Sequence, residues 1–223
     1  MGVPFVIHNK PCASYVIGTM EVVRATPDCY TLGYGNIVSL ATNRAFMPKV
    51  PYEVDKNLTL ISGALRVVNV LVVNNNLPVK TVPELIAYAR KNSGKLVQGS
   101  AGNGTSGQLG GELLRSMTQT SMLHVRYKAV TAAITDLIGG DVHLMLENTP
   151  VLGPHVQAGR MRALGISGTQ RSPNYPDIPT IAESVPGFKA AGWGGIIGPA
   201  NMPKDIVTRL NAEIRTALVN PAV

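Results

Sequence analysis

Short apolar runs alternate with stretches of helical spacing along the chain, and Gly or Pro stands at most of the junctions. The apolar runs predict strands and the amphipathic stretches predict helices. This alternation is typical of α/β folds with a largely parallel sheet. The predicted strands cover residues 31–34, 67–73, 96–99, 123–127, 142–146, 162–166 and 192–198. The predicted helices cover residues 16–24 and 130–138, end near residues 93, 117 and 158, and include a last one that starts near residue 203.

Local signals indicate several of these boundaries. Thr81 and Glu84 have the spacing of a capping box at the start of one helix, and Gly94 ends that helix. Residues 167–186 are rich in Pro, Ser and Thr, which predicts a long surface connection. The strand that follows is rich in glycine, which lets a backbone or a ligand approach closely.

The composition supports a folded chain and limits its partners. The 223 residues are 45% hydrophobic, which is ample for a core, and no uncharged apolar run approaches the roughly 18 residues that span a bilayer. The net charge of +7 is dispersed, aromatic residues make up 5%, and no nucleic-acid-binding module is present, so we expect no nucleic-acid partner. A mild positive field instead favours the capture of small anions.

The two cysteines, Cys12 and Cys29, are too few for a disulfide scaffold and lack the spacing of a zinc site. The helix predicted between them separates them by roughly 13 Å, which favours two inert thiols, with a bridge as the alternative. The sequence begins directly with a strand and shows no secretory signal. We therefore expect a truncated chain.

Residues 102–107 read G-N-G-T-S-G, after a predicted strand and at the start of a helix. This is the context of the dinucleotide fingerprint, but the acidic residue expected about 20 positions later is missing, because that strand ends in R-Y-K. The exposed amides and positive end of a helix bind any anion, including a carboxylate. A glycine loop that serves only a tight turn is the alternative. Donors for an anion would come from Ser100, Asn103, Thr105 and Ser106.

Other chemistries find little support. No G-x-S-x-G elbow and no H-E-x-x-H motif occur, and the four histidines lack supporting motifs. We therefore predict no catalytic residue, no metal site and no cofactor. Glu147 and Asn148 follow a predicted strand at the end that faces the ligand in open α/β sheets, which makes them candidates, although a helix cap would explain them equally.

Several segments, taken in order, resemble one family, the Bug-type periplasmic solute-binding receptors of tripartite tricarboxylate transporters. A-T-P-D-C-Y-T-L at residues 25–32 is similar to the family signature A-x-P-D-G-Y-T-L. G-S-A-G-N-G-T-S at residues 99–106 is similar to its helix-opening loop. The likeness continues with V-R-Y-K at residues 125–128, G-G-D-V at 139–142, A-G-R-M-R-A-L at 158–164 and P-D-I-P-T at 176–180.

The chain departs from the family pattern at four residues. Cys12 and Cys29 stand where the family usually has glycine, His8 replaces an acid, and Ala129 replaces a glycine. If Cys29 adopts a positive φ, its backbone is strained by on the order of 1 kcal/mol. The family's first strand with its following loop and a C-terminal stretch are missing, so we expect an incomplete first domain and only part of a pocket.

The resemblance implies an α/β fold with two doubly wound lobes and a cleft between them, like periplasmic binding proteins of type II. It places one domain at residues 1–97 plus 195–223 and the other at residues 98–194. It implies a monomeric, non-enzymatic periplasmic receptor that captures a dicarboxylate, aromatic acid or amino acid and delivers it to the membrane subunits of a transporter. The expected ligand-binding residues are Gly35, Asn36, Ser100, Ala101, Asn103, Thr105, Ser106, Tyr127 and Asn148.

Two alternatives stay open at this point. One is a nucleotide-dependent enzyme that uses the loop at residues 102–107. The other is a partial receptor that folds but binds no ligand.

Overall fold

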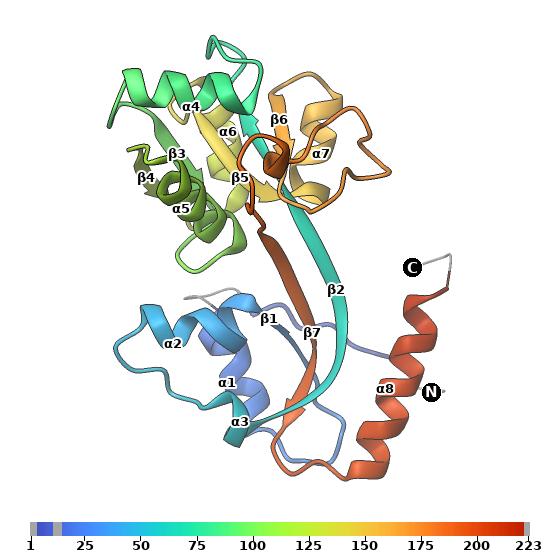
Figure 1. The fold of residues 1–223 in the computed structure, drawn as a ribbon. Coiled ribbons are helices and arrows are strands. Elements are labelled where there is room, and N and C mark those ends of the chain that lie inside the picture. Colours follow the sequence, from blue (N-terminus) through green and yellow to red (C-terminus); the bar gives the residue numbers. More distant parts are fainter. Residues whose placement is uncertain (1–3, 11–14, 221–223) are drawn as a thin grey trace. The chain divides into compact units, whose positions relative to one another are not determined.

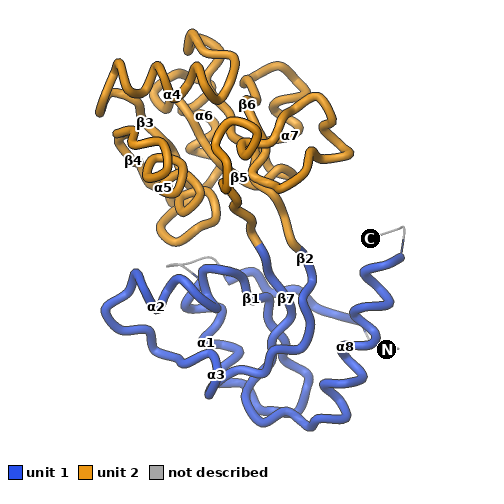
Figure 2. Tube along the Cα trace, viewed as in Figure 1, with its two compact units in different colours: residues 1–65, 193–223 blue, residues 66–192 orange. Residues whose placement is uncertain are grey.

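The computed structural model describes residues 4–10 and 15–220 of the chain. The chain divides into two compact units, unit 1 with residues 1–65 and 193–223, and unit 2 with residues 66–192 (Figure 2). Two strands continue from one unit into the other, β2 (Leu58–Val73) and β7 (Ala191–Pro199) (Figure 1). No helix within the described ranges is long and apolar enough to cross a membrane.

The division differs from the domains that the sequence implies. Residues 66–97, expected in the first domain, belong to unit 2. The reason is strand pairing, because the second half of β2 pairs antiparallel with β5 (Leu144–Asn148) and with β6 (Arg162–Ile166). The helix that follows β2 also packs in the unit 2 core, through Leu85 and Ala89. The second crossing, between residues 192 and 193, falls close to the expected position.

Unit 2 is built on a five-stranded mixed sheet with the order β6-β2-β5-β3-β4, in which β3 spans Val97–Ser100 and β4 spans Leu123–Arg126. β3 is parallel to both β4 and β5, as the alternating sequence pattern predicts, whereas β2 runs antiparallel to its neighbours. The remaining elements of this unit are α4 (Val82–Lys91), α5 (Ser106–Thr118), α6 (Val130–Gly139), α7 (Thr149–Gln157) and the 3₁₀ helix η3 (Ile181–Glu183).

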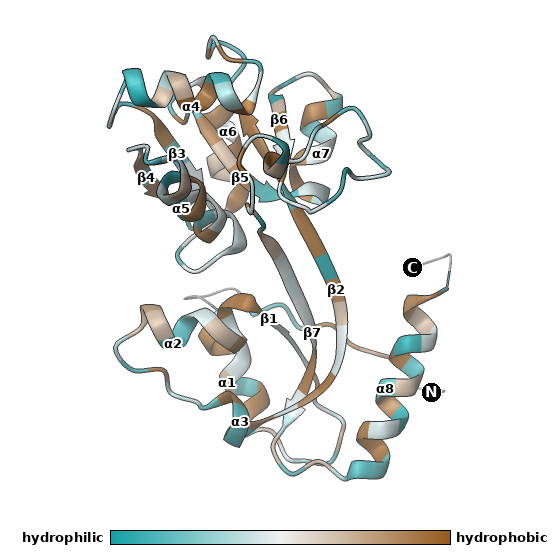
Figure 3. Cartoon of the chain, in the orientation of Figure 1, coloured by the Kyte–Doolittle hydropathy of each residue, from teal (hydrophilic) through white to brown (hydrophobic). Residues whose placement is uncertain are grey.

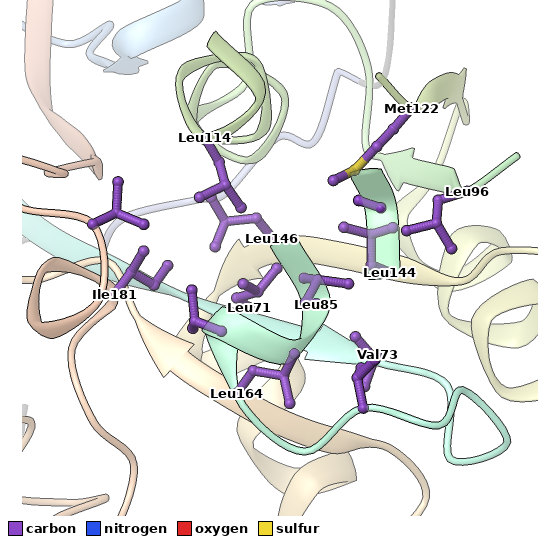
Figure 4. Close-up of a cluster of buried hydrophobic side chains, with 14 of the residues drawn as sticks. Leu71, Val73, Leu85, Leu96, Leu114, Met122, Leu144, Leu146, Leu164 and Ile181 are labelled. Carbon is purple, nitrogen blue, oxygen red and sulfur yellow. The ribbon is translucent and has the colours of Figure 1, made fainter. Parts of the chain in front are cut away.

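Both faces of this sheet are covered, which explains its nearly continuous apolar strands (Figure 3). On one face, Leu71 and Leu146 pack against α4 and α5, where Leu114 points at the sheet (Figure 4). On the other face, Val72 and Met145 pack against α6 and α7. The two core clusters lie entirely within residues 66–192. The predicted doubly wound arrangement is therefore confirmed for unit 2.

Unit 1 has a smaller sheet in which β1 (Gly33–Asn36) pairs antiparallel with β7, and β7 neighbours β2. The last helix buries Leu210 against Ile61 and Met202. A second cluster around Val22 and Ile197 packs beneath the first helix. The helices of this unit are α1 (Val16–Arg24), the π-helix η2 (Val38–Thr42), α2 (Asn43–Phe46), α3 (Val54–Asn57) and α8 (Lys204–Leu218).

Cys29 has a φ of 72°, in the region that favours glycine. The departure from the family glycine at this position therefore strains the backbone, as the sequence predicts. Cys12, the other partner of the bridge considered from the sequence, lies outside the described residues.

Candidate functional site

The candidate site lies at one edge of the unit 2 sheet, where β3 and β5 end. These strands are parallel neighbours, so the loops that follow them meet at the same edge. The loop after β3 contains Gly102 and Gly104, whose φ values are 127° and 75°. Any residue other than glycine would adopt such φ values only with a strained backbone. We call the loop at residues 101–105, the first turn of α5 and the side chains of Asn69, Glu147 and Asn148 the α5 site.

Thr105 caps α5 and holds the loop. Its Oγ1 accepts a hydrogen bond from the Gln108 N–H at 3.3 Å and donates one to the Gly102 carbonyl at 2.9 Å. The helix ladder starts with the Leu109 N–H bonded to the Thr105 carbonyl. The N–H groups of Ser106 and Gly107 precede Leu109, the first helical donor, and are therefore left at the positive end of the helix.

Three polar side chains meet beside this helix end. The Ser106 hydroxyl lies 3.3 Å from Asn69 Oδ1 and 3.4 Å from Asn148 Oδ1. Asn69 and Asn148 face each other in the β2–β5 register. Asn69 is fully buried, and its Nδ2 has no hydrogen-bond partner among the described residues. A Cβ on Gly192 would lie 3.0 Å from Asn148 Oδ1, so the glycine makes room for this cluster.

Glu147 is buried at the same edge, with 4% of its surface exposed. Its Oε1 accepts a hydrogen bond from the Asn148 N–H at 2.8 Å, and its Oε2 has no partner within the described part of the chain. Burial raises the pKa of the Glu147 carboxyl, and the Asn148 N–H opposes this rise. A Cβ on Gly107 would lie 3.3 Å from Oε2, which places the carboxyl against the first turn of α5.

Ser100 and Tyr127 lie near the loop but have other partners. The Ser100 hydroxyl is fully buried and lies 2.7 Å from His124 Nε2, so it fixes the end of β3. The Tyr127 hydroxyl donates to Asp136 at 2.6 Å, and this hydrogen bond, together with burial, raises the pKa of Tyr127 to about 12. Both side chains therefore form hydrogen bonds within unit 2, next to the edge of the sheet where β3 ends. Of the other predicted loop residues, Asn103 is exposed and Ala101 is half-buried.

Gly35 and Asn36 lie in unit 1, at the end of β1. Asn36 Oδ1 accepts from the N–H groups of Val38 and Ser39, at 3.0 and 3.1 Å, and so caps the following helical segment. A Cβ on Gly35 would lie 2.8 Å from Leu40, so this glycine allows close packing. Each of the two residues has a structural role within its own unit.

The structure thus brings Ser100, Ala101, Asn103, Thr105, Ser106 and Asn148 to a single edge. The set of site residues expected from the sequence lacks Asn69, although an amide that interrupts the apolar run at residues 67–73 is a usable signal. It also lacks Glu147, which the sequence marks only by its position at a strand end. Both are buried polar groups beside the helix start.

This arrangement can bind an anion with neutral donors. Hydroxyl, amide and helix N–H groups can surround a carboxylate without leaving an unpaired cation buried. Across the described residues, no three His, Cys, Asp or Glu side chains group as metal ligands.

Gly107 allows α5 to pack against the sheet, because a Cβ there would lie 2.1 Å from the Leu146 carbonyl oxygen.

Comparison with known proteins gives a consistent result. Residues 1–223 match the family described as tripartite tricarboxylate transporter family receptor. R. palustris Rpa4515 with adipate is 35% identical, with a TM-score of 0.93 over 98% of this chain and 73% of that one. MatC (Rpa3494) from Rhodopseudomonas palustris with bound malate is 27% identical, with a TM-score of 0.84 over 94% of this chain and 72% of that one. The periplasmic binding protein BugD is 29% identical, with a TM-score of 0.86 over 97% of this chain and 73% of that one. The chain therefore belongs to the receptor family of tripartite tricarboxylate transporters, the family of the Bug proteins that its sequence motifs resemble.

Proposed function

We propose that this protein is a periplasmic receptor that binds a small organic dicarboxylate and delivers it to the membrane subunits of a transporter. The observation that carries the proposal is the α5 site, where the N–H groups that precede the first helical donor adjoin the hydroxyl and amides of Ser106, Asn69 and Asn148. These groups suit a carboxylate because they are donors fixed in place before the ligand arrives.

The related structures support the ligand class. Rpa4515 is described with adipate and MatC with malate, and both ligands are dicarboxylates. Since this chain is similar to both proteins over nearly its whole length, we expect a ligand of the same class. BugD is a periplasmic binding protein, which supports a periplasmic location and a role in binding rather than catalysis.

We assign the site residues two kinds of role. Ser106, Asn69 and the Ser106 and Gly107 N–H groups would contact one carboxylate, with Asn148 beside them. Thr105, Ser100 and Tyr127 would position the loop, because their hydroxyl groups bond to the Gly102 carbonyl, His124 and Asp136, which lie outside the cluster of Ser106, Asn69 and Asn148. Ala101 and Asn103 would form the exposed rim. For Gly35 and Asn36, and for a monomeric state, the expectation from the sequence stays a prediction.

Titration calorimetry of the purified protein with adipate and malate tests the proposal. We expect binding of at least one dicarboxylate, and binding that is weaker by about ten- to a hundredfold in Ser106→Ala, because a lost hydrogen bond to a charged group costs about 1.5–3 kcal/mol. Ser116→Ala is the matched control, since Ser116 is exposed on the same helix.

Two results would argue against the proposed function. Binding that Ser106→Ala and Ser116→Ala leave equally unchanged would remove the α5 site from the ligand contacts. If no dicarboxylate bound at millimolar concentration while a nicotinamide nucleotide raised the melting temperature, the nucleotide-dependent enzyme would replace the receptor.

A further inference from the structure

We propose that Glu147 holds a proton when an anion occupies the α5 site, so that binding takes up a proton and weakens as the solution becomes more alkaline. This inference rests on the proposed function of the site. It makes Glu147 a positioning residue that sets the charge of the site, and no ligand contact is required of it.

The geometry places the buried Glu147 carboxyl beside the position where we expect the anion to bind. Glu147 Oε2 is shielded from solvent and has no hydrogen-bond partner among the described residues. It adjoins Gly107, whose N–H is one of the two left at the start of α5. An ionised Glu147 would therefore compete with the ligand for the positive end of the same helix.

No described cation forms an ion pair with Glu147. Around it, β2 carries Arg66, α6 carries Asp136 and α7 carries His155, while β3 carries no charged side chain. On α5, Glu112 and Arg115 pair with each other. Burial is the main influence on this carboxyl and raises its pKa, which favours the neutral form.

The sign of the linkage follows from the two charges. A carboxyl with a raised pKa is neutral in acid and becomes ionised as the pH rises through that pKa. A bound carboxylate raises the Glu147 pKa further, because like charges repel. The affinity for the anion is then highest at a pH below the Glu147 pKa of the free protein. It falls as the pH rises from that pKa to the higher Glu147 pKa of the ligand-bound protein. Each unit of additional pKa shift weakens binding about tenfold.

Calorimetric titration with adipate between pH 6 and 9 tests the linkage. Both adipate carboxyls stay ionised in this range, because ordinary carboxyl pKa values are near 4.3. Repeating each titration in two buffers of different ionisation enthalpy gives the number of protons taken up. For the unmutated protein we expect proton uptake and a dissociation constant that increases with pH, about tenfold for each unit by which the bound anion raises the Glu147 pKa. The Glu147→Gln variant should take up no proton through this residue, and its dissociation constant should increase much less with pH. At pH 9 it should bind adipate at least as tightly as the unmutated protein does.

Two controls make the result specific. Glu213→Gln, which removes an exposed carboxylate from α8, should behave like the unmutated protein. His124→Gln addresses the other titratable group near the loop, since protonation of His124 would strengthen anion binding in the same direction. The pH dependence above pH 7 should persist in His124→Gln and vanish in Glu147→Gln.

Clear outcomes would overturn the inference. Binding of adipate without proton uptake at any pH would refute it while leaving the proposed function intact, and this measurement needs no variant. An unchanged pH dependence in a folded Glu147→Gln protein would also refute it. Absence of adipate and malate binding at every pH would instead refute the proposed function, and the inference with it.

Discussion

At the residue scale, the hydroxyl of Thr105 takes part in two hydrogen bonds within the α5 site. This single hydroxyl both accepts from the Gln108 N–H and donates to the Gly102 carbonyl. The same group thus starts the helix and closes the glycine loop before it. Because a hydroxyl has only one hydrogen to donate, direct donation to a ligand would require Thr105 to release the Gly102 carbonyl, and the ligand contact expected from the sequence stays a prediction.

Replacing Thr105 tests this double role. Thr105→Val keeps the shape of the side chain but removes the cap, so we expect a loss of about 1 kcal/mol in the free energy of unfolding, measured in urea. Thr105→Ser retains the hydroxyl and should lose much less. Equal stability of the Val and Ser variants would show that the hydroxyl does not cap α5.

At the element scale, α5 packs closely against the sheet because its inner face carries Gly107, Gly110 and Gly111. A Cβ on Gly107 would lie 2.1 Å from the carbonyl oxygen of Leu146, which is backbone and cannot turn away. This approach puts the first turn of α5 against the ends of β3 and β5. The glycine loop therefore positions a helix start at the sheet edge, as well as forming a turn.

Gly107→Ala should separate α5 from β5. We expect destabilisation by about 1–3 kcal/mol, because the added methyl forces a backbone shift, and weaker dicarboxylate binding. Gly139→Ala is the control, since nothing lies within 4 Å of a Cβ there and its position in α6 favours alanine by up to about 1 kcal/mol. Thermal unfolding followed by circular dichroism measures both variants, and similar stability for the two would contradict the close contact.

At the scale of the whole molecule, each hydrophobic core cluster lies within one of the two units. The two clusters of unit 2 lie within residues 66–192, and those of unit 1 lie outside that range. Strand β2 contributes Leu71 and Val73 to one unit 2 cluster and Val70 and Val72 to the other. Without the second half of β2, the unit 2 sheet would lose a central strand.

Two fragments distinguish this division from the one implied by the sequence motifs. Residues 66–192 contain a complete sheet with both faces covered, so we expect a single cooperative thermal transition by circular dichroism. Residues 98–194 lack β2 and α4, and we expect no cooperative transition. If the shorter fragment unfolded cooperatively and the longer one did not, the boundary at residue 66 would be in error.

The sequence by itself determined the local features of this protein. The strands of unit 2, the cap at Thr81 and the glycine loop follow from periodicity and from hydrogen bonds between residues a few positions apart, as at Thr81 and Glu84. The first half of β2, from Leu58, and the short helices α2 and α3 are not predicted by the local pattern. Its ordered motifs also determined the family. Only the tertiary structure decided that the second half of β2 joins unit 2, that Asn69 meets Ser106, and that Glu147 is buried with no partner for Oε2 among the described residues. These outcomes depend on strand pairing and packing between distant segments, and such contacts leave little trace in the local pattern of a single sequence.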